Sequence, residues 1–318
     1  MSEENVTVPK NGIDEGNDNA NDTSQTKKTY APLTPKLMME LAAPHTWAAS
    51  IFPVLIGTAL AQATLSYEQS GFVDAVMCCI LLLICILFQS AVNTVNDYYD
   101  YVKGTDTKEN QDDPTDAVLV YNNVNLRSAL AYAIGLIVIA FALGLYVISQ
   151  AGMIPLVIAI VGVIVIFLYS GGKTPISYLP IGELVSGFVM GGLITLAVYQ
   201  VLTLEFSWMV LVYSIPQMLG IGLIMFTNNG SDIEKDIQAH RKTMPVLVGR
   251  ARVDRVYNGV VYAWTIAICV IVLAFFIDGW VILPFMLIAV HPLAHNLMSI
   301  PLGQKTRGAK FGQYTSLN

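Results

Sequence analysis

Long runs of apolar residues alternate with short polar connections from residue 37 onward. Eight of these runs are long enough to cross the hydrocarbon core of a bilayer, which takes roughly 20 helical residues. Proline and glycine interrupt several runs, and membrane helices tolerate both residues when neighbouring helices satisfy the freed carbonyls. The pattern predicts an all-α fold, a polytopic bundle of transmembrane helices. The expected spans are 37–64, 72–98, 127–149, 153–170, 181–202, 207–228, 256–277 and 280–300.

Both ends of the chain are polar. Residues 1–36 are rich in Asp, Glu, Asn and Thr and contain too few apolar side chains to form a core, so we expect a disordered cytoplasmic tail. Residues 301–318 form a second polar stretch, also expected on the cytoplasmic side. The transmembrane domain is therefore expected over residues 37–300.

Composition and charge agree with a membrane location. Only 13% of the 318 residues are charged, against roughly a quarter in an average soluble domain, which excludes a soluble globule. The net charge of −6 argues against nucleic acid as a partner. All 17 Lys and Arg residues fall in the tail, in alternate connections or in the C-terminal stretch. The positive-inside rule then predicts a multi-pass protein of the cell (inner) membrane with a cytoplasmic N-terminus.

Amides and carboxylates gather where the second expected span meets the cytoplasm. Asn93 and Asp97 lie four residues apart, as do Asn96 and Asp100, so a helix presents them on one face. We call these four residues the first acidic cluster; Asp106 follows shortly after it. The alternative is a solvated helix end, but acids that adjoin a hydrophobic span are costly and typical of function. The cluster contains no basic residue, which points to a bound cation as the counter-charge.

A second acidic cluster follows the sixth expected span. Asn228, Asp232 and Asp236 recur every four residues, which predicts one helical stripe of oxygen ligands on the same side of the membrane. Oxygen ligands without histidine or thiolate favour Mg²⁺, which is commonly completed by substrate phosphate. The predicted metal ligands are Asn96, Asp97, Asp100, Asp106, Asp232 and Asp236.

Basic residues on the same side complete the predicted site. Lys103 follows the first cluster, Arg241 and Lys242 follow the second, and Lys173 lies in the connection between the fourth and fifth spans. Together with a metal ion, these cations suit a diphosphate. For Arg241 and Lys242 the alternative is a purely topological role. The Lys173 segment is not a P-loop, because position 167 is Phe where that motif needs glycine.

These motifs resemble the UbiA superfamily of intramembrane prenyltransferases, and most closely its 1,4-dihydroxy-2-naphthoate branch. The matching segments are Asn96-Asp97-Tyr98-Tyr99-Asp100-Tyr101, Asn228-Asn229-x-x-Asp232-x-x-x-Asp236, Tyr169-Ser-Gly-Gly and Pro44-His45. The resemblance implies about nine membrane helices around a cavity, and this chain ends where relatives begin a ninth span, so we expect either a truncated sequence or an eight-span form.

The same resemblance implies an activity and roles for individual residues. Magnesium held by the aspartates, with Asp100 and Asp232 catalytic, would bind the diphosphate of a polyprenyl donor. The prenyl group would pass to an aromatic acceptor, with decarboxylation in the naphthoate branch of menaquinone biosynthesis. The residues expected to line the cavity or contact the acceptor are His45, Asn93, Tyr101, Tyr169 and Asn228.

Three departures from the family pattern leave the acceptor open. The family usually has basic residues where this chain has Ala43, Asp116 and Ser231. A sister prenyltransferase with another aromatic acceptor is therefore one alternative. A secondary transporter, which can also place carboxylates among interrupted helices, is an alternative of a different class.

Overall fold

The computed structural model describes residues 30–104, 107–108, 117–171, 174–276 and 278–315. The chain divides into two units, Met1–Tyr30 and Ala31–Asn318. Most of the expected tail lies outside the described residues, as do Asp106, Asp116 and Lys173.

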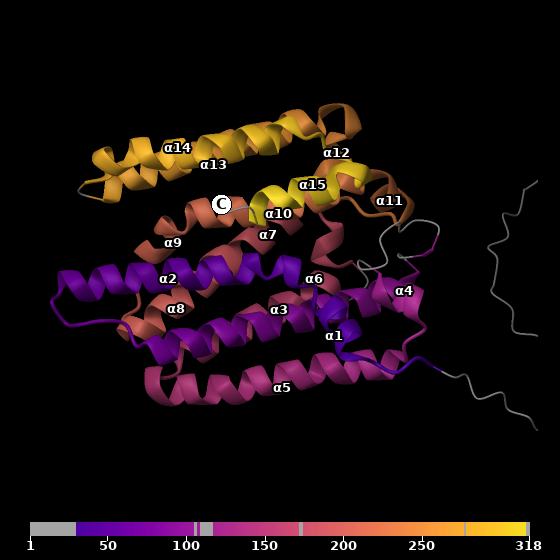
Figure 1. Cartoon of the computed structure of the whole chain (residues 1–318), viewed down its shortest axis with the longest axis horizontal. Helices are drawn as coiled ribbons and strands as arrows, with labels where there is room; N and C mark the ends of the chain where they lie inside the picture. The colour runs from indigo at the N-terminus through magenta and orange to yellow at the C-terminus, as the bar shows by residue number, and fades with distance from the viewer. Residues whose placement is uncertain (1–29, 105–106, 109–116, 172–173, 277, 316–318) are drawn as a thin grey trace, which may run out of the picture. The chain divides into compact units, whose positions relative to one another are not determined.

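The second unit is built of helices (Figure 1). The longer ones are α2 (Ala48–Tyr67), α3 (Ala75–Lys103), α5 (Leu126–Ala151), α6 (Ile154–Ser170), α8 (Ile194–Thr203), α10 (Ile215–Ser231), α13 (Arg250–Phe275), α14 (Gly279–Ser299) and α15 (Gln304–Thr315). The shorter ones are α1 (Pro35–Ala42), η1 (Pro44–Thr46), α4 (Val118–Asn122), η2 (Ile176–Tyr178), α7 (Gly182–Ser186), η3 (Gly187–Leu193), α9 (Met209–Tyr213), α11 (Ile233–Gln238) and α12 (Met244–Val248).

The predicted polytopic helical bundle is confirmed, with a different number of full-length spans. Among the described residues, six helices are long and apolar enough to cross a membrane: Ala48–Tyr67, Ala75–Lys103, Leu126–Ala151, Gly182–Thr203, Arg250–Phe275 and Gly279–Ser299. The fourth expected span is the shorter α6, with 17 residues. The sixth is divided between α9 and α10, which meet at Ser214, just before Pro216.

The first expected span is also divided, because its N-terminal third is not part of α2. Helix α1 ends at Ala42, and Ala43 adopts a left-handed conformation with φ 46° before Pro44 starts η1. Proline cannot donate a backbone hydrogen bond and disfavours the helical conformation in the residue before it. The corner at Ala43 and Pro44 therefore separates α1 from the membrane helix.

The long helices pack in two groups that are joined through α10 and the segment α7–η3–α8. Helices α2, α3, α5 and α8 share one core, while α10, α13 and α14 share another (Figure 1). Two glycines allow the close contact between the groups. A Cβ atom on Gly187 would lie 2.4 Å from the carbonyl oxygen of Met218, and one on Gly191 would lie 2.8 Å from the Met218 Cα. The η3 segment, a short π-helix, lies at this contact.

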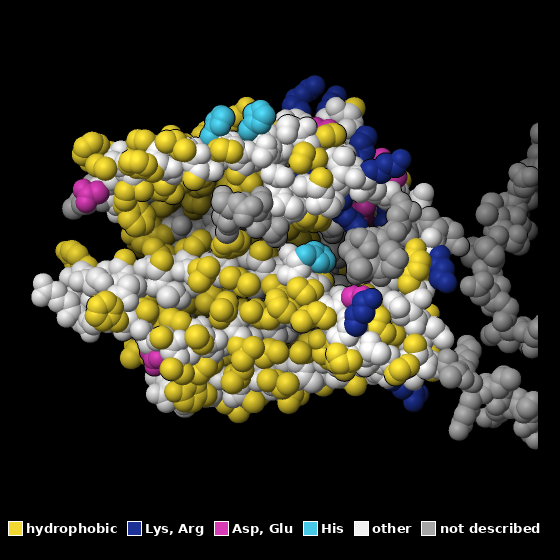
Figure 2. Space-filling model, viewed as in Figure 1, with side chains coloured by type: hydrophobic (Ala, Val, Ile, Leu, Met, Phe, Trp, Pro, Cys, Tyr) yellow, Lys and Arg dark blue, Asp and Glu magenta, His cyan; other side chains and the backbone are white. Residues whose placement is uncertain are grey.

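The surface of the bundle agrees with a lipid environment. Large hydrophobic side chains are exposed along the long helices, among them Ile139, Phe141, Phe285 and Ile288. On the face that Figure 2 draws, hydrophobic side chains cover the length of the helices, whereas Lys and Arg gather at the end where α11 and α12 lie. Such extensive apolar exposure would be a liability in water. The same end of the bundle contains the two acidic clusters.

Candidate functional site

The first acidic cluster lies on the last turns of α3, a continuous helix of 29 residues. Its N-terminal end is capped by Asp74, whose Oδ1 accepts hydrogen bonds from the backbone N–H groups of Val76 and Met77. Its C-terminal end is closed by Gly104 in a left-handed conformation. The predicted helix is confirmed here, and it brings the side chains of the cluster to successive turns of one face. Both carboxylate oxygens of Asp97 are buried.

The second acidic cluster does not lie on one continuous helix, contrary to the prediction, although Asp232 and Asp236 each donate a backbone hydrogen bond to the residue four positions earlier. Helix α10 ends at Ser231 and α11 starts at Ile233, while Asp232 has φ −106° and ψ 23°. The break is stabilised by Arg250 of α13. Its guanidinium donates hydrogen bonds to the carbonyl oxygens of Gly230 at 2.7 Å and Ser231 at 3.2 Å, which replace bonds that a continuing helix would supply. Asp232 therefore lies at the junction of two helices.

Arg241 joins the two clusters. Its guanidinium donates to Asp100 Oδ1 at 3.0 Å and lies 3.5 Å from Asp236 Oδ1, although these acids are far apart in sequence. Burial alone would lower the pKa of Arg241, but the two carboxylates outweigh it and raise that pKa above its usual value. The counter-charge that the first cluster lacks within its own helix thus comes from Arg241.

Asp236 is the most deeply buried carboxylate of the second cluster, with 2% of the residue exposed. Burial raises the pKa of its carboxyl group to about 6, against the opposing effects of Arg241 and of a hydrogen bond that Thr243 donates at 3.1 Å. Because burial disfavours its ionised form, a further positive charge nearby would stabilise the Asp236 carboxylate.

Three of the four predicted diphosphate ligands contact Tyr178 of η2. The Arg241 guanidinium carbon lies 4.9 Å from the centroid of its ring, and the Lys103 ammonium lies 5.6 Å from the same centroid. The backbone N–H of Lys242 donates to the Tyr178 carbonyl at 2.8 Å. The structure therefore brings Lys103, Arg241 and Lys242 to one place, beside both acidic clusters.

Sequence reasoning missed Arg307. This residue lies on α15, and its Nη1 atom is 2.9 Å from Asp232 Oδ2 and 3.5 Å from Asn228 Oδ1. The guanidinium and the Asp232 carboxylate are both largely buried. No local pattern singles out Arg307, because it stands in a polar stretch of mixed composition 75 residues from Asp232.

The residues expected to contact an acceptor have different surroundings. Asn93 is a tether: its amide donates to the Ala42 carbonyl at 2.9 Å and to Thr46 Oγ1 at 2.7 Å. Tyr101 is exposed, whereas Tyr169 is partly buried within electrostatic range of Asp236 and Arg241. The neighbouring Asn229 and Glu183, joined by a hydrogen bond of 2.9 Å, connect α10 to α7.

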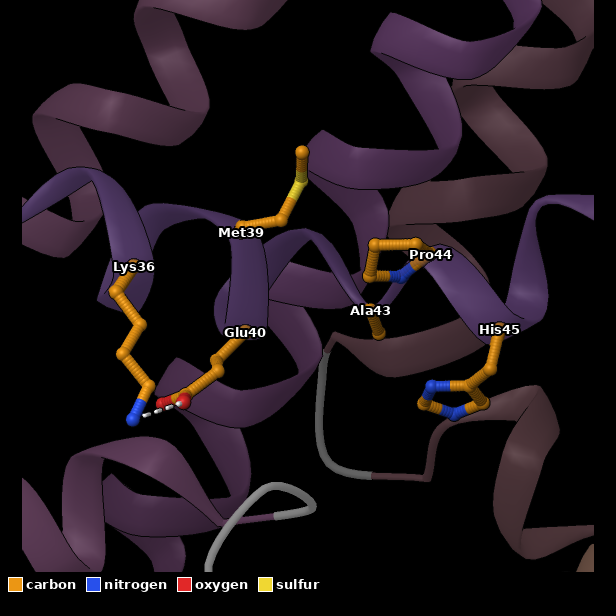
Figure 3. Close-up of a pocket in the computed structure, with 6 residues that line it drawn as sticks. All are labelled: Lys36, Met39, Glu40, Ala43, Pro44 and His45. Carbon is orange, nitrogen blue, oxygen red and sulfur yellow. Dashed lines mark ion pairs between the residues drawn. The ribbon is translucent and has the colours of Figure 1, made fainter.

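His45 lines a separate pocket of about 310 Å³ (Figure 3). Its other lining residues all come from α1 and the corner that follows it: Lys36, Met39, Glu40, Ala43 and Pro44. Lys36 and Glu40, four residues apart on α1, form an ion pair at 3.6 Å. No residue of either acidic cluster lines this pocket, so its geometry does not connect His45 with the predicted metal ligands.

The chemistry of the two clusters fits a hard divalent cation. Their side chains offer only carboxylate and amide oxygens, and the buried oxygens of Asp97 and the buried carboxylate of Asp236 supply concentrated negative charge. Within the described residues, which omit Asp106, no three acidic, histidine or cysteine side chains already converge on one point. Two arginines instead neutralise Asp100, Asp232 and Asp236.

Known proteins resemble this chain in sequence. The profile of the UbiA prenyltransferase family matches residues 50–317. The chain is 34% identical over 214 residues to a 1,4-dihydroxy-2-naphthoate octaprenyltransferase of Bacillus subtilis. It is 29% identical over 221 residues to the UbiA prenyltransferase domain-containing protein 1 of Homo sapiens. The two alignments cover 67% and 69% of this chain, and 66% and 63% of the respective relatives.

Solved structures resemble it in fold. A UbiA homologue from Archaeoglobus fulgidus bound to GPP and Mg²⁺ matches with a TM-score of 0.66 over 88% of this chain and 95% of that one. The same homologue bound to DMAPP and Mg²⁺ gives a TM-score of 0.64. Both are 17% identical to this chain, so the likeness concerns the arrangement of the helices.

Proposed function

The chain belongs to the UbiA prenyltransferase family, and from this premise we propose that it transfers a polyprenyl group from an allylic diphosphate to an aromatic acceptor. The observation that supports this most directly is the position of Arg241, which contacts Asp100 of one acidic cluster and Asp236 of the other. The carboxylates of both clusters and the guanidinium of Arg241 therefore lie together at the polar end of an apolar bundle. A polyprenyl diphosphate has the same division into a charged head and a lipid tail.

Mg²⁺ is the proposed metal. The residues that would hold it are the oxygen ligands of the two clusters: Asn96, Asp97, Asp100, Asp106, Asp232 and Asp236. When bound, the ion supplies Lewis-acid stabilisation for the negative charge of the departing diphosphate. Asp100 and Asp232 are the proposed catalytic residues, one from each cluster.

The basic residues of the chain bind and orient the diphosphate. The cationic groups of Lys103 and Arg241 each contact the ring of Tyr178. Lys242 is held beside them by the hydrogen bond from its backbone N–H to the Tyr178 carbonyl. Lys173, in the connection before η2, is the fourth proposed contact. Arginine suits this task because its planar fork can donate two parallel hydrogen bonds to one phosphate group.

The proposed acceptor is 1,4-dihydroxy-2-naphthoate, supported by the similarity to the Bacillus subtilis octaprenyltransferase. Loss of diphosphate leaves an allylic cation, which the electron-rich ring attacks at the carbon bearing the carboxyl group. Carbon dioxide then departs, and the electron pair of the broken bond restores the aromatic ring. Tyr101, Tyr169 and Asn228 are the proposed cavity residues nearest this chemistry, and His45 is a further proposed contact. The side-chain amide of Asn93 is instead assigned to its hydrogen bonds with Ala42 and Thr46.

The proposed setting is the cell (inner) membrane, with the N-terminus and the mouth of the site on the cytoplasmic side. The gathering of Lys and Arg at the end of the bundle that contains the acidic clusters supports this orientation (Figure 2). A water-soluble naphthoate would reach the site from that side, and the polyprenyl tail would remain among the apolar helices.

Substitution of one carboxylate from each cluster tests the proposal. Membranes containing the full chain are supplied with Mg²⁺, dihydroxynaphthoate and labelled polyprenyl diphosphates of several lengths. We expect Asp100→Asn and Asp232→Asn each to lower turnover by about a hundredfold or more, because each removes negative charge from the diphosphate and metal site. Glu205→Gln, which changes an exposed acid between α8 and α9, serves as the control with full activity.

Three results would refute parts of this proposal. Full turnover by either aspartate variant removes the assigned catalytic roles. Product formed with another aromatic acceptor, such as 4-hydroxybenzoate, in place of dihydroxynaphthoate identifies a sister prenyltransferase. Movement of substrate across sealed vesicles without any product identifies a transporter.

A further inference from the structure

Each acidic cluster is neutralised by an arginine from outside its own helix. Arg241 contacts Asp100 and Asp236, while Arg307 of α15 lies 2.9 Å from Asp232. The side chains of Arg307 and Asp232 are 16% and 13% exposed, so the pair is withdrawn from bulk water but accessible to a ligand. Arg307 also reaches Asn228 Oδ1 at 3.5 Å. It therefore contacts two of the three residues that make up the second acidic cluster.

The position of Arg307 is fixed by a set of contacts that holds α15 in place. Lys310, only 1% exposed, donates from its ammonium group to the carbonyl oxygens of Leu297, in the last turn of α14, and of Ile300, the residue that caps this helix. The same ammonium lies 4.2 Å from the centroid of the Tyr257 ring on α13. Burial lowers the pKa of Lys310 to about 8, so the group is charged at neutral pH. A buried lysine in these contacts positions the turn of α15 that contains Arg307.

The connection before α15 adds a second anchor. The backbone N–H of Leu302 donates to Asp254 Oδ1 at 2.8 Å, and the Leu302 carbonyl accepts a hydrogen bond from Arg250 at 3.0 Å. The Leu302 side chain packs against Gly230, where a Cβ atom would lie 2.9 Å from Leu302 Cδ1. Arg250 thus links the break after α10 to the segment that leads into α15. Arg307 and Asp232 are held against each other from both sides.

Stability alone gives little reason for this arrangement. A largely buried ion pair gains about as much from attraction as it loses by desolvation, and apolar replacements are often equally stable. A guanidinium beside predicted metal ligands has a clear chemical use, because its fork matches a phosphate group. Arg241 is positioned in the same way and is already a proposed diphosphate ligand.

We propose that Arg307 is a further diphosphate-binding residue of this site, supplied by the C-terminal helix α15. Without substrate its guanidinium balances Asp232; in the loaded site it contacts the diphosphate of the prenyl donor. This inference rests on the proposed function, since it takes the ligand class from there.

Two binding measurements on the purified full chain in detergent test this role without turnover. The first follows Mn²⁺ alone by electron paramagnetic resonance, and the second follows farnesyl thiodiphosphate, an analogue that resists cleavage, in the presence of Mg²⁺. We expect Arg307→Gln to weaken analogue binding by about tenfold or more, because a charged hydrogen-bond donor is lost. Mn²⁺ alone should bind at least as tightly as before, since a positive charge next to Asp232 has been removed.

Matched variants separate this role from a structural one. Lys305→Gln changes an exposed cation on the same helix and should leave both affinities unchanged. Arg307→Lys, which keeps the charge but loses the fork, should weaken analogue binding by a smaller factor. If Arg307→Gln is too unstable to purify, Arg307→Lys gives the same test. Unchanged analogue binding, or equal loss of both affinities, overturns the proposal.

The outcome for Arg307 is distinct from the outcome for the proposed function. Weakened analogue binding in a chain that prenylates no aromatic acceptor would support Arg307 as a diphosphate ligand and refute the transfer reaction. Normal analogue binding by Arg307→Gln in a chain that does prenylate dihydroxynaphthoate would refute only the role of Arg307.

Discussion

The two acidic clusters offer the same kinds of side chain but are positioned by different means. The first lies on α3, which runs unbroken from Ala75 to Lys103 and is tied to its neighbours by neutral hydrogen bonds such as those of Asn93. The second lies across the break between α10 and α11, and charged residues of α13 and α15 hold it there.

This difference determines how each cluster depends on the rest of the chain. The geometry of the first cluster follows from helix periodicity, which is a local property. The geometry of the second requires Arg250 and Arg307, which follow Asp232 in sequence by 18 and 75 residues. Substitutions far from Asp232 should therefore change the second cluster while leaving the first intact.

The largest effect is expected where the two clusters meet, at Arg241. Arg241→Gln leaves Asp100 and Asp236 facing each other without the charge between them. We expect a loss of about 2–3 kcal/mol in the free energy of unfolding, since Arg241 is mostly buried, Asp236 is almost fully buried and Asp100 is only partly exposed. Thermal unfolding in detergent measures this loss, and turnover should fall with it because a proposed diphosphate ligand is removed.

An exposed arginine on α13 provides the control for Arg241. Arg252→Gln removes a similar side chain from the surface and should change stability by less than about 0.5 kcal/mol. Equal melting temperatures for Arg241→Gln and the parent chain would mean that Arg241 does not join the clusters.

A smaller effect, confined to the second cluster, is expected at Arg250. Arg250→Gln removes the donors to the carbonyl oxygens of Gly230, Ser231 and Leu302, which should cost about 2 kcal/mol of stability. The ion pair with Glu234 contributes little of this, because Glu234 is 60% exposed. Glu234→Gln should therefore cost less than about 1 kcal/mol. Equal losses in the two variants would show that the ion pair, and not the helix break, is what Arg250 stabilises.

Much of the fold could be predicted because apolar runs of membrane length are explicit in the sequence. Six of the eight expected spans correspond to helices long enough to cross a membrane. Two of the differences occur where a local interruption overrides hydrophobicity. Ala43 and Pro44 separate α1 from α2, and Ser214 separates α9 from α10. Hydropathy measures whether a segment is apolar, but a corner depends on backbone conformation at one or two residues.

The site could be predicted only as far as its geometry is local. The four-residue spacing of Asn93, Asp97 and their neighbours placed them correctly on one face of α3. The same rule failed at Asp232, because it assumes that the helix continues. Contacts between distant segments decide that break, and they also decide the position of Arg307. Sequence spacing contains no information about such contacts.

The smallest of these effects is expected in the first cluster, at Asn93. Asn93→Ala removes the two hydrogen bonds that its amide donates to the Ala42 carbonyl and to Thr46 Oγ1, together with one that it accepts from Gln89. The substitution should cost about 1–2 kcal/mol of stability. Asn296→Ala, which loses one exposed hydrogen bond to Gln313, should cost less than about 0.5 kcal/mol and is the matched control. Because a tether of the helix corner need not touch the acceptor, KM for the acceptor should change less than the melting temperature. A large rise in that KM at unchanged stability would instead make Asn93 a substrate contact. The neutral hydrogen bonds of Asn93 would then not be what positions the first cluster, and the contrast with the second cluster would be weaker.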